Sequence, residues 1–163
     1  MITAMCIAAA NYLINKTNDY NTGKKYSERI SMTCKRLQKL LYFSEIEYMK
    51  TNKGTPMFSD DFRAWPSGPV IPSVYDVFVQ YQDGEMYPVD ETGHSPITAD
   101  MEKALETIFS QTVLIDTLDL VDYSHIPNGP WAKHFDASDE QHIQIIPKEE
   151  IYMFYQNRTP LSK

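Results

Sequence analysis

Residues 37–78 carry the clearest pattern in this chain of 163 residues, and they read LQKLLYFSEIEYMKTNKGTPMFSDDFRAWPSGPVIPSVYDVF. In the first half, apolar and small residues recur at i, i+3, i+4, i+7 and i+11 from Leu37 to Tyr48, which predicts an amphipathic helix. The second half crowds three prolines and a glycine into residues 66–72, which opposes a regular strand ladder and favours a rigid, turn-rich path. A rigid aromatic and proline segment beside a strong helix predicts either a packing centre or a recognition surface.

Helix signals continue outward from this stretch in both directions. Residues 2–16 are rich in helix formers, whereas residues 17–27 are polar and contain turn formers, so a loop is expected there. Ser31 or Thr33 can cap the central helix, and Gly54 supplies the left-handed residue that would end it.

On the C-terminal side, Pro72, Thr98 and Pro147 mark the expected starts of three further helices, because proline suits the first turn and threonine caps it. The helix after Thr98 should bury one face, formed by Met101, Leu105, Ile108, Phe109 and Thr112. Residues 117–124 predict another short helix, with Leu118, Leu120 and Val121 buried.

Extended structure is expected in only a few places. Two short apolar pieces, Met57-Phe58 and residues 62–65, predict either a small β-hairpin or an extended path. Residues 82–96 predict a long loop with a short strand around residues 86–89. The expected fold is therefore mainly α: one compact helical domain of about five to seven helices over residues 1–163, with at most a small hairpin.

Composition narrows the functional class. The formal net charge of −7 disfavours binding to a nucleic-acid backbone and suits a basic protein partner. Two cysteines, Cys6 and Cys34, are too few for a disulfide framework and are expected to be buried thiols. No signal-peptide pattern and no apolar run of about 18 residues is present, which predicts a cytoplasmic protein without a membrane partner.

No catalytic motif emerges. The four histidines, His94, His125, His134 and His142, lack metal-ligand spacing, so neither a metal nor a cofactor is expected. His125 is expected to hold a turn through hydrogen bonds to backbone carbonyls. The pair Ser67-Gly68 lacks the context of a nucleophile elbow and is better explained as a turn.

Basic and aromatic side chains offer two further candidates. Lys35, Arg36 and Lys39 form a small basic group on the central helix, for which a solvated face is the default and an acidic partner the alternative. Trp65 and Trp131 each lie beside a proline; both are expected in the core, although tryptophan is also a common interface anchor.

Taken together, these motifs resemble the phage-associated SocA-like family, also called the Panacea domain. The residues that carry the resemblance are Leu37 to Phe43, Ala64-Trp65, Gly68-Pro69-Val70, Pro72 with Tyr75, and His125 with Pro130-Trp131. The family commonly has threonine before this histidine, and here Ser124 keeps the hydroxyl. The chain has no separate DNA-binding extension, which some members have.

The resemblance implies a mostly helical antitoxin that neutralises a toxin encoded nearby by protein–protein contact, without enzymatic activity. A protease adaptor that delivers the toxin to a AAA+ protease is an alternative. A small enzyme with a site around His125, Asp76 and Tyr75 is a second alternative. The residues expected to bind the partner or to carry the motif are Gln38, Lys39, Tyr42, Trp65, Gly68, Pro69, Tyr75, His125 and Trp131.

Overall fold

The computed structural model describes residues 3–81, 85–91 and 96–162. Within these residues the helices are α1 (Thr3–Asn21), α2 (Cys34–Thr51), α3 (Pro72–Phe78), α4 (Ala99–Thr112), α5 (Thr117–Ser124), α6 (Pro130–His134) and α7 (Lys148–Tyr155). Two single 3-10 turns, η1 (Tyr26–Glu28) and η2 (Val79–Tyr81), and three strands, β1 (Phe62–Trp65), β2 (Gly68–Val70) and β3 (Ile145–Ile146), complete the described elements. The mainly helical fold with a small antiparallel sheet is as predicted. His94 lies outside the described residues.

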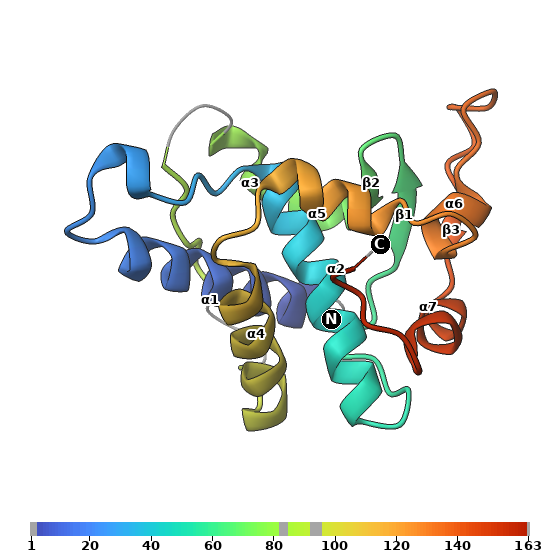
Figure 1. Cartoon of the computed structure of the whole chain (residues 1–163), viewed down its shortest axis with the longest axis horizontal. Helices are drawn as coiled ribbons and strands as arrows, with labels where there is room; N and C mark the ends of the chain where they lie inside the picture. The colour runs from blue at the N-terminus through green and yellow to red at the C-terminus, as the bar shows by residue number, and fades with distance from the viewer. Residues whose placement is uncertain (1–2, 82–84, 92–95, 163) are drawn as a thin grey trace.

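Helix α2 runs through the middle of the molecule, and α1, α3, α4, α5, α7 and β2 all pack against it (Figure 1). Every side chain from Arg36 to Ile46 is buried. The expectation that Arg36 and Lys39 lie on a solvated basic face is therefore wrong, and only Lys35 of that group is exposed. The Arg36 guanidinium instead donates to the carbonyls of Thr112 and Ile115, both at 2.8 Å, and so ties the end of α4 to α2.

Helix α1 is longer than its composition predicts. It continues to Asn21, so the loop expected from residue 17 begins only after Asn21. The Thr17 hydroxyl is buried and donates to the Leu13 carbonyl at 2.9 Å. The Asn21 side chain bonds both the N–H and the carbonyl of Ile30 at 2.8 Å. These contacts order a polar segment that would otherwise favour a turn.

The proline-rich segment forms a regular hairpin, contrary to the expectation that it would exclude a ladder. Strand β2 pairs antiparallel with β1 in the register Arg63↔Val70 to Trp65↔Gly68, and β3 pairs with the other side of β1. Pro69 fits because β2 is an edge strand, where a missing N–H breaks no ladder on its outer side. Met57-Phe58 is not the partner of β1; both side chains are buried in the core.

The predicted helix boundaries are mostly confirmed. Thr33 and Thr98 accept hydrogen bonds from the N–H groups of Arg36 and Met101, so each caps its helix. Gly54 has φ +86 after α2, Pro72 begins α3 and Pro147 precedes α7. The five residues predicted for the buried face of α4 are all buried: Met101, Leu105, Ile108, Phe109 and Thr112.

Three smaller expectations are wrong. Residues 86–89 form no strand, because Asn11 and Asn18 of α1 supply side-chain hydrogen bonds to this backbone in place of a neighbouring strand. Leu118 is 72% exposed, since α5 turns the opposite face, with Leu120, toward the core. Cys34 is half-buried, whereas Cys6 is buried as expected.

Candidate functional site

Two adjacent side chains of α2 hold the outer edge of the hairpin. The Gln38 amide donates to the Ile71 carbonyl at 3.1 Å and accepts from the Ile71 N–H at 2.8 Å, as a neighbouring strand would. The Lys39 ammonium donates to the Pro69 carbonyl at 2.9 Å. We call this arrangement the clamp. Because it occupies these edge groups of residues 69 and 71, the clamp fixes where the hairpin lies on α2.

Gly68 is part of the same arrangement. Its φ of +116 lies in the region that favours glycine. A Cβ at this position would come within 2.6 Å of Lys39 Cε and 2.9 Å of Ser124 Oγ. The glycine therefore allows the lysine to reach the strand, and the two motif residues depend on each other.

The Lys39 side chain is fully buried, and no carboxylate pairs with it within the described residues. Burial, and secondarily repulsion from Lys35, lowers the pKa of Lys39 to about 7. Burial and the nearby Lys39 charge also lower the pKa of His125 below its usual value. A protonated Lys39 thus disfavours protonation of His125.

A stack of three rings supports the hairpin from the other side. The His125 and Trp131 rings are parallel with centroids 3.6 Å apart, and Phe135 stacks on the far face of Trp131 at 4.6 Å. The Trp131 indole donates to the Trp65 carbonyl at 2.7 Å. The Ser67 backbone lies close enough to the His125 ring to act on its pKa. The buried Nε2 atom of the ring has no hydrogen-bond partner within the described residues, so the prediction that hydrogen bonds from His125 hold the turn stays a prediction.

Between α2, the hairpin and α3 lies a cavity of about 250 Å³, which we call the aromatic pocket. Trp65 and Tyr75 form much of its wall, in an edge-to-face pair with centroids 5.1 Å apart. The full lining is Thr33, Cys34, Lys35, Gln38, Trp65, Ser67, Val70, Tyr75 and Val79. Gln38 belongs to both the clamp and this wall, so the clamp positions the pocket.

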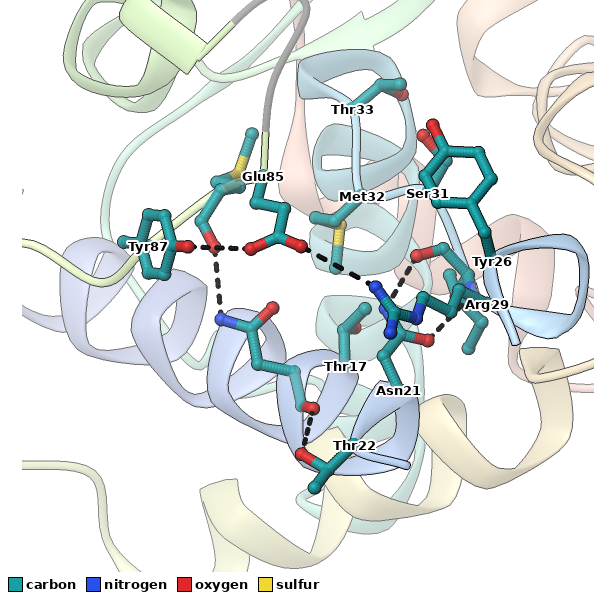
Figure 2. A pocket seen from close by; sticks show the side chains of 13 residues that line it. Thr17, Asn21, Thr22, Tyr26, Arg29, Ser31, Met32, Thr33, Glu85 and Tyr87 are labelled. Atoms are coloured by element: carbon teal, nitrogen blue, oxygen red, sulfur yellow. Dashed lines mark hydrogen bonds and ion pairs between the residues drawn. The ribbon is translucent and has the colours of Figure 1, made fainter. Parts of the chain in front are cut away.

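A larger cavity of about 780 Å³, the polar pocket, lies between the end of α1, residues 26–33 and residues 85–87. Figure 2 shows that its polar side chains satisfy one another: Tyr87 and Arg29 both reach Glu85, at 2.6 and 3.8 Å. Asn18 donates to the Met86 carbonyl at 3.1 Å. The aromatic pocket, by contrast, brings together residues of the sequence motif.

The nine candidate residues therefore separate into distinct places. The clamp and its strand contain Gln38, Lys39, Gly68 and Pro69; the ring stack contains His125 and Trp131; the aromatic pocket exposes Trp65 and Tyr75. Tyr42 lies apart from all of these, fully buried against Phe43, Phe62 and Tyr155. The core placement expected for Trp65 is not observed, since Trp65 is only half-buried.

The three residues of the alternative enzymatic site do not line a common cavity among those described above. Tyr75 lines the aromatic pocket, but His125 and Asp76 line neither of the two cavities described above. Asp76 is exposed, and the His125 ring is covered by Trp131. Among the residues that the structure describes, no group of three His, Cys, Asp or Glu side chains could hold a metal ion. No described helix is long and apolar enough to cross a bilayer.

Sequence reasoning missed a buried ion pair that lies about two turns further along α2 than Gln38. Glu45 is fully buried, and the Lys148 ammonium of α7 approaches its carboxylate at 2.6 Å and the Phe58 carbonyl at 2.6 Å. The same ammonium lies over the Phe58 ring at 4.4 Å. Two glutamates, Glu45 and Glu47, interrupt the largely apolar residues 40–49, and nothing in the sequence indicates which of them is buried.

Comparison with known families agrees with these motifs. The family model described as "Antitoxin SocA-like, Panacea domain" matches residues 37–132, which is more than half of the chain. The match contains α2 from Leu37 onward, the hairpin and the His125–Trp131 pair. It also contains the lining of the aromatic pocket except Thr33, Cys34 and Lys35. The chain belongs to this family of antitoxin-like proteins. No curated protein and no solved structure matches it.

Proposed function

We propose that this protein is the antitoxin of a prophage-type toxin–antitoxin pair and that it neutralises its toxin by direct binding, without an enzymatic step. Membership of the antitoxin-like family supports the general role. The toxin would be encoded beside this chain, and the whole chain would act as one domain of the Panacea type.

One observation supports the choice of the aromatic pocket as the toxin-binding surface. Residues of the family motif that lie far apart in the sequence, Gln38, Trp65 and Tyr75, converge on one pocket, and two of them present aromatic rings there. Interface anchors are typically aromatic side chains in or around a concave site. The clamp and the ring stack behind the pocket hold those rings on a rigid base, which lowers the entropic cost of binding.

Co-expression with the product of the adjacent reading frame tests the proposal. The neighbour alone should stop growth, and this chain should restore growth and co-purify with it. Tyr75→Ala should abolish rescue while leaving the thermal melt nearly unchanged, because Tyr75 is only half-buried. The matched control is Tyr26→Ala, an 88% exposed tyrosine of the polar pocket, which should still rescue. A harmless neighbour that does not co-purify would overturn the proposal.

The same assay separates neutralisation by binding from delivery to a protease. Rescue by occlusion should persist in a host that lacks its AAA+ proteases, and the toxin level should stay constant. Rescue that disappears in that host, with accumulation of the toxin, would favour the adaptor instead.

A further inference from the structure

The size of the aromatic pocket fits one large side chain. Its volume of about 250 Å³ is below the roughly 300–1,000 Å³ of sites that enclose whole small molecules. Four of its lining residues, Trp65, Val70, Tyr75 and Val79, offer apolar or aromatic surface. A single aromatic or large aliphatic side chain would therefore fill it, as an interface anchor does.

The charge at the pocket is opposite to that of the protein. Lys35 is the one charged residue in the lining, and its ammonium makes no ion pair within the described residues. The buried Lys39 lies close enough to Lys35 for the two charges to repel each other. The lining of the pocket is therefore positively charged, although the net charge of the whole chain is −7.

The wall offers several hydrogen-bond donors, and its Ser67 and Tyr75 hydroxyls can also accept. The Trp65 indole N–H and the Tyr75 hydroxyl make no hydrogen bond within the described residues, and an ammonium can only donate. None of the described residues that line the pocket carries a carboxylate. A ligand that presents an acceptor with negative charge would satisfy these groups.

We infer that the aromatic pocket captures an apolar anchor side chain of the toxin that is flanked by a carboxylate, and that Lys35 binds this carboxylate. The inference rests on the proposed function for the identity of the partner. It assigns Lys35, which the family motif does not include, as a residue that determines which toxin is bound.

Lys35 can be tested without loss of the fold. Its side chain is exposed and lies in the first turn of α2, where an acidic residue is favoured by the helix dipole. Lys35→Glu should weaken the toxin complex at least about tenfold, as expected when one partner of a desolvated charge pair is reversed. Lys35→Arg should keep the affinity. Lys103→Glu, at an exposed lysine of α4, changes the net charge equally and should have little effect.

The decisive experiment combines that affinity series with a probe that needs no toxin. In an NMR titration of the full chain, N-acetyl-Phe-Asp-amide should move the Trp65 indole resonance and N-acetyl-Phe-Lys-amide should not. Lys35→Glu should remove the response to the first peptide.

The outcomes are distinguishable. Equal responses to the two peptides, or none to the acidic one, would overturn the inference, as would an unchanged toxin affinity for Lys35→Glu. If the acidic peptide alone moves Trp65 but the neighbouring gene product is harmless, the chemistry assigned to the pocket stands and the proposed antitoxin function fails.

Discussion

Two lysine ammonium groups, that of Lys39 in helix α2 and that of Lys148 against it, have different electrostatic surroundings. Lys148 from α7 lies between the Glu45 carboxylate, the Phe58 carbonyl and the Phe58 ring, so its charge is compensated. Lys39 has one carbonyl as its partner and a second lysine nearby. The Glu45 region is therefore a neutral link that fastens α7 to the core. In the Lys39 region the buried ammonium has no carboxylate partner within the described residues, and burial lowers its pKa because the charged form is disfavoured there.

The largest loss of stability is expected when the carboxylate that pairs with Lys148 is removed. Glu45→Ala should lower the free energy of unfolding by about 3–5 kcal/mol, because the largely buried Lys148 charge would lose its only carboxylate partner within the described residues. Urea unfolding measures the change. The double variant Glu45→Met, Lys148→Met should lose clearly less than the single variant, since no charge is left behind. A double variant as unstable as Glu45→Ala would show that packing, not charge, dominates this region.

In the Lys39 region we expect a smaller loss of stability, caused by steric overlap, when Gly68 is replaced. Gly68→Ala should cost about 1–3 kcal/mol, from the positive φ and from the approach of Cβ to Lys39. Gly23→Ala is the matched control, since Gly23 also has positive φ but nothing lies within 4 Å of its added Cβ. Gly68→Ala should therefore exceed Gly23→Ala in chemical denaturation. Equal losses would mean that the lysine moves aside freely.

The charge of Lys39 should appear as a pH dependence. Its pKa is lowered from 10.5 to about 7 in the folded protein, so the unfolded chain binds more protons between these values. Stability should therefore rise with pH above 7, by about 2 kcal/mol up to pH 9. Lys39→Met should flatten this rise, whatever its effect on stability at a single pH. Above pH 9 the raised pKa of the Cys6 thiol acts in the opposite direction, so the comparison belongs below that limit.

The smallest effect comes from Lys35. Lys35→Glu should change the free energy of unfolding by no more than about 0.5 kcal/mol, as is usual for an exposed position. It should also move the pH-dependent rise to higher pH, because repulsion from Lys35 contributes to the low pKa of Lys39. Thermal melts from pH 7 to 9 would detect the displacement. A rise that stays in place would show that burial alone sets the Lys39 pKa.

Local signals predicted much of the fold because helix ends are determined by nearby residues. Thr33, Thr98 and Pro72 act within one helical turn, and the buried face of α4 follows from periodicity alone. The candidate site was predicted only as a set of residues. That Tyr42 is in the core while Trp65 and Tyr75 line a pocket depends on how the hairpin lies on α2, which no local pattern specifies.

The sequence by itself determined the helical class, the family and most helix boundaries, because these depend on residues close together in the chain. Only the tertiary structure decided that Arg36, Lys39 and Glu45 are buried. Their partners lie 79, 30 and 103 residues away, at Ile115, Pro69 and Lys148. A charged side chain is stable in the interior only where such partners are present. The hydropathy of the α2 sequence does not reveal these carbonyl and ammonium groups, because they belong to distant residues.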